Sequence, residues 1–185
     1  MGVEGIIRVA LRGGPTESEA RLRFEFYSIF VALAMLNMIV FGALALVQRR
    51  YLLGGLITAS GAGLVVGWLR MRTGRDDRRV YRINALVFGL LVLYMLVLGG
   101  ESGSKSLWMY SYPLIVAFLF GEHEGAAWNL GLFLCAGALI GFSWPWISVY
   151  PYPFAFKIRL MAVYLIIAVT TLGFEYSRRR YRDAM

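Results

Sequence analysis

The sequence predicts an all-α membrane protein, a bundle of six transmembrane helices with both termini in the cytoplasm. Hydrophobic residues make up 59% of its 185 residues, whereas soluble domains hold about 45–50%. The charged residues stand in short clusters between long uncharged runs, which is the pattern that a bilayer imposes. Positive charges are also dense in alternate loops, and this alternation predicts which side of the membrane each loop faces.

The first 15 residues precede any long apolar run. Apolar residues recur at helical spacing over 3–11, although two glycines weaken the pattern. This segment is expected to be either a short amphipathic helix on the membrane surface or a disordered tail. A Gly-Gly-Pro sequence ends it, and Thr16 and Glu19 then form a capping box. We therefore expect a helix to start at Thr16 and to continue into the membrane.

Six apolar runs follow, and each is bounded by charged residues, glycines or prolines. A Gln-Arg-Arg turn separates the first two, an arginine-rich loop precedes the third, and a loop rich in proline and aromatic residues precedes the sixth. The fourth run is short for a membrane helix, so it is expected to be extended by interfacial aromatic residues or partly buried in the bundle. The predicted spans are 24–47, 51–69, 83–98, 107–120, 126–142 and 158–174.

The positive charges predict the topology. With the N-terminus inside, the cytoplasmic segments hold 14 of the 19 Lys and Arg residues, and such an excess marks the cytoplasmic side. Residues 16–176 are then one six-helix domain, and 177–185 begin a cytoplasmic signalling helix or linker. The net charge of +8 lies beside apolar spans, so membrane lipids with anionic headgroups, and not nucleic acid, are the expected partners.

Small residues recur four apart within the second predicted span, and a further pair occurs in the fifth. Such a stripe permits close contact between helices, within one bundle or between two copies. A homodimer is the expected assembly. The packing residues are Gly55, Ala59, Gly63, Gly67, Gly137 and Gly141.

Two short motifs suggest chemistry that the predicted topology argues against. Ser102 lies in a Gly-x-Ser-Gly pattern similar to that of rhomboid-type intramembrane proteases, but the single histidine, His123, is predicted on the opposite side of the bilayer. Glu122, His123 and Glu124 share one tight turn and cannot all converge on one ion. The sequence therefore predicts no catalytic residue, no metal site and no cofactor. The predicted spans also hold no charged residue near the membrane midplane, where ion-coupled transporters usually keep ionisable groups.

Aromatic residues and cations gather in the two long loops predicted on the outer face. One interpretation is a mouth for a ligand with an apolar body and a carboxylate. The other is an ordinary aromatic belt with snorkelling cations. The candidate ligand-binding residues are Lys105, Trp108, Tyr110, Tyr112, Trp144, Trp146, Tyr152, Lys157 and Arg159.

Segment 94–182 resembles the N-terminal multi-helix sensor region of bacterial signalling proteins, of which the MASE-type membrane sensors are the broad group. The resemblance rests on a Gly/Ser-rich loop leading to Ser-x-Leu-Trp, and on a Pro-led apolar helix that ends in a Gly-x-x-x-Gly turn. The last span also closes with Phe-Glu-Tyr and an arginine-rich tail. Such regions are attached to GGDEF diguanylate cyclases or to histidine kinases.

The resemblance implies a sensor module of the bacterial inner membrane, without catalysis of its own. Its outer face would bind a small apolar or amphipathic signal, and the last span would relay a shift to a cytoplasmic effector. The candidate relay residues are Glu175, Arg178 and Arg179. Glu175 and Arg179 lie four residues apart, which predicts an ion pair on one helix face. The alternative function is a small transporter or channel subunit.

Overall fold

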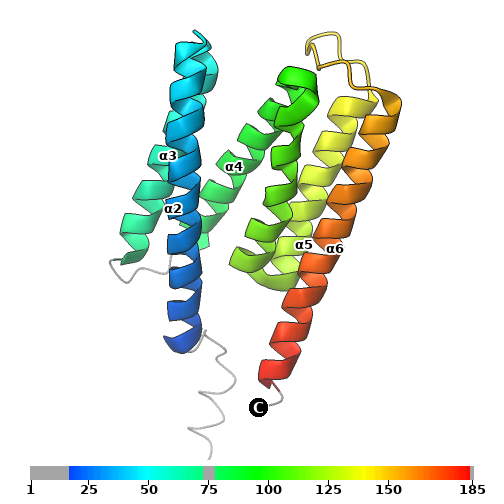
Figure 1. Ribbon diagram of the computed structural model, residues 1–185. Coiled ribbons are helices and arrows are strands. Elements are labelled where there is room, and N and C mark those ends of the chain that lie inside the picture. Colours follow the sequence, from blue (N-terminus) through cyan, green and yellow to red (C-terminus); the bar gives the residue numbers. More distant parts are fainter. Residues whose placement is uncertain (1–16, 73–77, 184–185) are drawn as a thin grey trace, which may run out of the picture.

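The computed structural model describes residues 17–72 and 78–183, and these residues form helices without any strand (Figure 1). The predicted all-α fold is therefore confirmed. The segment 1–15 and Thr16 lie outside the described residues. The elements are α2 (Glu17–Val47), α3 (Tyr51–Arg72), α4 (Arg78–Leu98), the 3₁₀ helix η1 (Glu101–Tyr110), α5 (Ser111–Gly141) and α6 (Phe154–Asp183).

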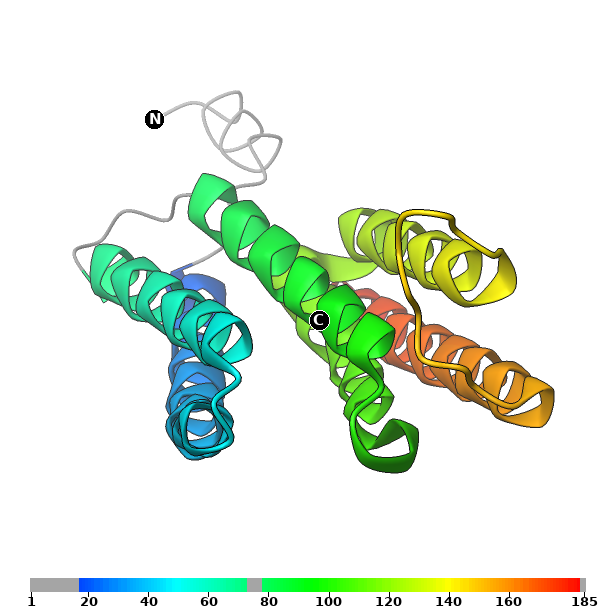
Figure 2. The same ribbon diagram turned by 90° about the horizontal axis from the view of Figure 1, so that it is seen from above.

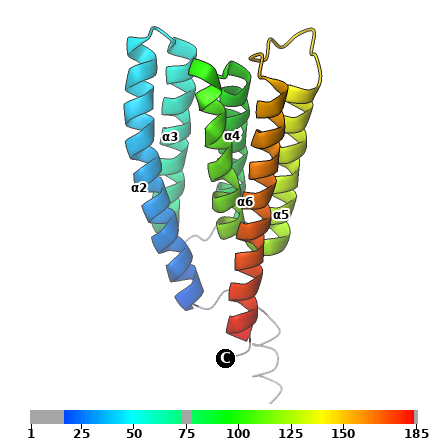
Figure 3. The same cartoon turned by 45° about the vertical axis from the view of Figure 1, so that its right-hand side comes forward.

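Five segments of the described chain are long and apolar enough to cross a membrane. Their length and composition are compatible with a multi-pass membrane protein. The helices run up and down between two ends of the molecule (Figures 1 and 3). We call these the loop end, which carries segment 142–153, and the tail end, where α6 stops. The five segments are Ser28–Val47, Tyr51–Arg70, Arg78–Leu98, Ser102–Gly141 and Phe154–Arg178.

The long fourth segment folds back on itself at Gly121. Gly121 has φ 76° and ψ −167°, a conformation open to glycine and costly for any residue with a Cβ. A Cβ built on Gly125 would lie 2.9 Å from the Cα of Ala117, whereas eight residues of a straight helix span about 12 Å. Helix α5 is thus a hairpin with two arms, 111–120 and 122–141, that run in opposite directions (Figure 1).

The main core lies among α4, η1, both arms of α5, and α6. Its fully buried side chains include Leu96, Met109, Val116, Leu160 and Tyr164. Helices α2 and α3 pack closely on each other and form a separate pair at the edge of this core (Figure 2). Smaller clusters join the pair to α4 and to the first arm of α5. The seam between the two groups of helices is therefore less densely packed than either group.

Helix α4 begins at Arg78, inside the stretch predicted as an arginine-rich loop. Val80 and Tyr81 are buried against α2 and α5, and Arg82 donates two hydrogen bonds to Glu124, at 2.7 and 3.2 Å. These contacts hold the first turn of α4 at the tail end. The expected start at residue 83 was wrong because a charge-rich turn can be helical when its apolar side chains are covered.

The small-residue stripe of α3 does not make the contact with α2. Gly55, Ala59 and Gly63 are exposed, and a Cβ on Gly55 would meet nothing within 4 Å. The neighbouring face packs instead, since a Cβ on Gly54 would lie 2.9 Å from Leu46 and one on Gly61 3.2 Å from Met38.

Two of the remaining small residues do face neighbours. Gly67 is buried, and a Cβ on Gly137 would lie 3.3 Å from Met161 of α6. Gly141 is exposed, and a Cβ there would meet nothing within 4 Å. Within this chain, the predicted packing role therefore fits Gly67 and Gly137 and does not fit Gly55, Ala59, Gly63 or Gly141.

Candidate functional site

A row of three cavities follows α2 along the seam that separates the α2–α3 pair from the rest of the bundle. Adjacent cavities share lining residues, so the three lie next to one another in a row from the loop end to the tail end. We call the row the α2 trough, and its parts the loop-end, middle and tail-end cavities. Ligand sites form preferentially at such seams between helices.

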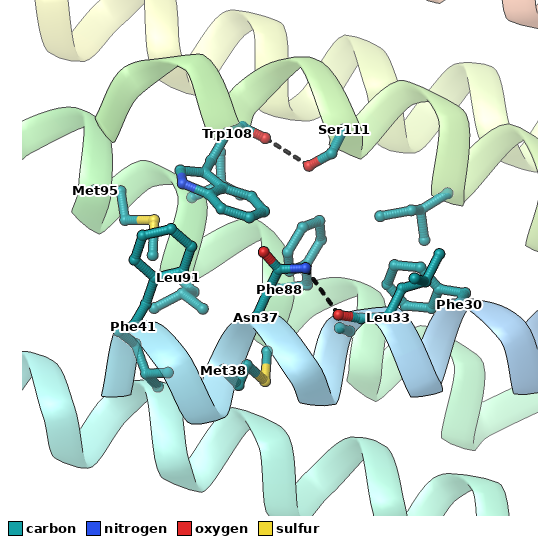
Figure 4. Close-up of a pocket in the computed structure, with 14 residues that line it drawn as sticks. Phe30, Leu33, Asn37, Met38, Phe41, Phe88, Leu91, Met95, Trp108 and Ser111 are labelled. Atoms are coloured by element: carbon teal, nitrogen blue, oxygen red, sulfur yellow. Dashed lines mark hydrogen bonds between the residues drawn. The ribbon is translucent and has the colours of Figure 1, made fainter. Parts of the chain in front are cut away.

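The middle cavity has a volume of about 140 Å³, and Figure 4 shows the side chains of α2, α4 and the η1–α5 segment that point into it. Its two polar side chains already have partners. The Asn37 amide donates to the carbonyl of Leu33 at 2.8 Å, and the Ser111 hydroxyl donates to that of Trp108 at 2.6 Å. The lining is Phe30, Leu33, Ala34, Asn37, Met38, Phe41, Ile57, Phe88, Leu91, Val92, Met95, Trp108, Ser111 and Ile115.

Because these hydrogen bonds are internal, the middle cavity presents an almost wholly apolar surface. An engineered apolar cavity of about 150 Å³ in another protein stays dry and binds benzene. The middle cavity therefore suits a ring or a short length of alkyl chain.

The loop-end cavity is wider, about 350 Å³, and has an apolar floor under a polar rim. Trp108 stands between it and the middle cavity, with its ring against Phe41 in an edge contact at 5.5 Å. The rim is formed by Gln48, Arg50, Ser104 and Lys105, and the floor by Phe41, Leu44, Ala45, Leu53, Ile57, Met95 and Trp108.

The tail-end cavity, about 320 Å³, lies between α2, the first arm of α5, and α6. Phe30 and Ile115 line both this cavity and the middle one. Glu175 of α6 lines it as well and is only 6% exposed. A ligand in the trough would therefore be one side chain away from the buried carboxylate of the last helix.

Arg178 is the partner of that carboxylate. Its guanidinium donates to Glu175 at 2.8 Å and lies over the Phe118 ring at 5.2 Å. This i,i+3 spacing brings the two side chains to one helix face. The predicted pairing of Glu175 with Arg179 stays a prediction, because the Arg179 side chain lies outside the described part of the chain.

The nine residues of the predicted aromatic mouth lie in several different surroundings. Trp108 and Lys105 line the trough, whereas Trp144 and Lys157 line a separate cavity of about 320 Å³ beside segment 142–153. Tyr112 is buried in the main core, stacked on Phe88 with ring centroids 6.0 Å apart, and Tyr110 is half-buried against the same core. The Tyr152 hydroxyl donates to the carbonyl of Leu96 at 2.7 Å, and burial raises the pKa of that hydroxyl. The three tyrosines therefore belong to the packing of the fold.

The other four predicted residues lie around segment 142–153. The Lys157 ammonium donates to the carbonyl of Ile140 at 2.6 Å, and the Trp144 indole to that of Ala138 at 3.0 Å. Both bonds engage carbonyl groups in the last turn of α5, where intrahelical donors run out. The Ala138 carbonyl also accepts a bond from the amide of Phe142, at 3.2 Å. Trp146 is 90% exposed, and Arg159 is exposed on α6. None of these four lines the trough.

The sequence prediction missed the α2 side of the site. Phe30, Leu33, Asn37 and Phe41 recur at helical spacing and line one face of α2. The single asparagine within the first apolar run was the available signal, because polar residues inside membrane spans tend to face the bundle interior. Arg50 was predicted to end the first span, and it also lines the loop-end cavity.

The side chains of the Glu122, His123 and Glu124 turn have different surroundings. The His123 side chain is 89% exposed and Glu124 is bound to Arg82. Among the described residues, no three His, Cys, Asp or Glu side chains come together as a metal site would require.

The candidate site is thus an apolar trough with a cationic rim at its loop end and a buried, arginine-paired carboxylate at its tail end. Comparison of the chain with known protein families, with curated proteins and with solved structures finds no match.

Proposed function

We propose that the chain is a transmembrane receptor module that binds a small apolar or amphipathic molecule in the α2 trough and relays its presence through α6. The single observation that carries the proposal is the middle cavity, whose polar side chains are bonded internally and whose remaining lining is apolar. Such a cavity favours an apolar occupant, since few polar groups in its lining would be desolvated on binding.

The proposed topology has six membrane crossings, with the tail end in the cytoplasm. The first arm of α5 crosses together with η1, and the second arm crosses alone. The second arm, 122–141, spans about 30 Å at 1.5 Å per residue, which matches the hydrocarbon core. The excess of arginine in the segments assigned to the tail end favours this orientation. The bacterial inner membrane is the proposed location, in line with the resemblance to MASE-type sensors.

The proposed relay uses the position of the trough between two groups of helices. A molecule that fits the trough better in one arrangement of these groups shifts the balance towards that arrangement. Phe30 and Ile115 connect the middle cavity to the cavity that Glu175 lines. A change there would move α6, whose described C-terminal turns extend beyond the other helices at the tail end (Figure 3). An effector of the diguanylate cyclase or histidine kinase type is the proposed recipient.

A matched pair of variants tests binding. Ala34 lines the middle cavity, whereas Ala32 is exposed on the same helix and lines none of the three cavities. Ala34→Phe places a benzene-sized ring in a cavity of about that capacity, while Ala32→Phe adds the same ring outside it. Each protein is extracted from its host membrane and weighed by native mass spectrometry. We expect a bound molecule on the wild type and on Ala32→Phe, and an empty Ala34→Phe. Equal occupancy of both variants would contradict the proposal.

A transporter is the second candidate, and one observation favours it. The three cavities of the trough succeed one another from one end of the bundle to the other, as the sites along a conduit would. Flux of the copurified molecule into sealed proteoliposomes separates the two functions. A receptor gives binding without flux above that of empty vesicles, and a transporter gives flux that Ala34→Phe blocks.

A further inference from the structure

We infer that the α2 trough binds a single-chain amphipathic carboxylate, with the carboxylate at the loop-end rim and the alkyl chain running past Trp108 into the middle cavity. This inference rests on the proposed function, because it names the chemical class of the molecule bound in the same trough. Three features of the trough support it: the charge of the rim, the anchored backbone of Arg50, and the volume of the middle cavity.

The rim carries positive charge. Both ionisable residues that line the loop-end cavity, Arg50 and Lys105, are cations, and Gln48 and Ser104 add hydrogen-bond donors. Among the side chains that the structure describes, no carboxylate lines this cavity. A guanidinium group binds a carboxylate through two parallel hydrogen bonds, which are stronger than bonds between neutral groups. A cationic headgroup would be repelled here, and a neutral one would gain nothing from the two charges.

Hydrogen bonds fix the backbone position of Arg50. The turn between α2 and α3 is held by a hydrogen bond from the amide of Arg50 to the carbonyl of Ala45, at 2.8 Å. The carbonyl of Arg50 in turn accepts a bond from the amide of Gly54, at 3.0 Å. Arg50 thus sits at the first turn of α3 with its backbone bonded on both sides. The preceding residue, Arg49, is exposed and lines none of the three cavities.

The middle cavity has room for one chain. It adjoins the loop-end cavity at a neck that we define by the four residues lining both cavities, Phe41, Ile57, Met95 and Trp108. The middle cavity beyond the neck, at about 140 Å³, is close to the volume that holds a single benzene molecule. Two acyl chains side by side, as in a phospholipid, would not fit this volume. The occupant that satisfies both the rim and the neck is therefore a free fatty carboxylate.

The test uses decanoate and decanol, which share an alkyl chain and differ in headgroup charge. Binding of each is measured by equilibrium dialysis against the full chain in phosphatidylcholine nanodiscs, at about pH 8.5, where carboxylates are ionised. We expect decanoate to bind at least about tenfold more tightly than decanol, which corresponds to about 1.4 kcal/mol. Arg50→Gln should remove most of this difference, Arg50→Lys should keep much of it, and the matched Arg49→Gln should leave it unchanged.

The outcomes separate this inference from the proposed function. If both probes bind with equal affinity and Arg50→Gln changes neither, the trough binds apolar molecules but the carboxylate assignment is overturned. If neither probe binds, the carboxylate assignment is overturned as well. Whether the copurified molecule is present on the wild type and absent from Ala34→Phe then tests the proposed function separately.

A second lipid composition tests the single-chain assignment. Nanodiscs containing phosphatidylglycerol repel decanoate from the wild type and from every variant alike. The ratio of decanoate affinities between Arg50→Gln and the wild type should therefore persist. Collapse of that ratio in these nanodiscs would mean that the anionic phospholipid itself occupies the rim, and would overturn the assignment to a free carboxylate.

Discussion

The hairpin in α5 predicts that Gly125 cannot be replaced by even the smallest side chain without cost. A Cβ at this position would lie 2.9 Å from the Cα of Ala117 and 3.0 Å from the carbonyl oxygen of Val116. Carbon atoms normally approach to about 3.5–4.0 Å. Both neighbours are backbone atoms, so no side-chain rotation can relieve the clash, and the two arms must separate.

The size of the effect follows from two opposing terms. Overpacking of this kind costs about 1–3 kcal/mol, and the change from glycine to alanine inside a helix returns about 1 kcal/mol. Gly131 lies on the same arm, and a Cβ there would meet nothing within 4 Å. Gly131→Ala therefore gains the helix-propensity term without the overpacking cost. The free energy of unfolding of Gly125→Ala should be about 1–3 kcal/mol lower than that of Gly131→Ala.

Reversible unfolding of the purified protein in mixed micelles, titrated with sodium dodecyl sulfate, measures this difference. Because the two variants have the same composition and lie on the same arm, the helix-propensity term cancels between them. Equal unfolding free energies for the two variants would refute the close contact between the arms. The reversal at Gly121, on which the six proposed crossings depend, would then have no support from packing.

Three further predictions concern the core, the topology and the assembly. Tyr164→Phe removes the buried hydroxyl that lies 3.1 Å from the side-chain oxygen of Asn129, so it should lower the free energy of unfolding by about 1–3 kcal/mol; an unchanged value would show that the hydroxyl contributes nothing. Single cysteines in a background without the native one should react with an impermeant reagent from outside at Ser148 and only after permeabilisation at His123, and the reverse pattern would contradict the proposed orientation. Gly63→Leu should weaken a homodimer, seen as a shift to monomer in native mass spectrometry, because Gly63 is exposed; an unaltered dimer would place the dimer contact elsewhere.

Most of the helices could be predicted from the sequence because hydropathy and helix length are both set by the bilayer. The boundary between the first two helices, with one ending at Val47 and the next starting at Tyr51, was predicted to the residue, since an exposed Gln-Arg-Arg turn separates them and holds Arg49 at φ 57°. The reversal near Gly121 was predicted as a turn between two spans, and the structure places it within one apolar segment of 40 residues. Glycines at both ends of that turn were the signal.

The site was harder to predict, for a physical reason. In a soluble helix, polar residues mark the exposed face, but a membrane helix is apolar on its lipid-facing side too. The face of α2 that lines the trough and the face that remains exposed carry the same residue types, as Leu33 and Leu36 illustrate. Only contacts with α4 and α5 distinguish them, and those depend on the tertiary arrangement.

The aromatic residues of the loops posed a related problem. A tyrosine or lysine at the end of a membrane helix has the same sequence signature whether it binds a ligand, anchors the helix or caps a neighbour. Tyr152 and Lys157 proved to bond to the carbonyl groups of Leu96 and Ile140. Their role follows from which helix end lies beside them, which no local pattern encodes.

The central claim is that a molecule in the α2 trough changes the position of α6. Spin labels at Ile29 of α2 and Tyr176 of α6, both exposed, report the separation of these helices near the tail end by pulsed electron paramagnetic resonance. The account predicts that stripping the copurified molecule shifts the distance distribution by about 1–2 Å or more, the scale of helix shifts in switching proteins. It also predicts that Ala34→Phe shows one distribution before and after stripping. Identical distributions for the loaded and stripped wild type would contradict the claim.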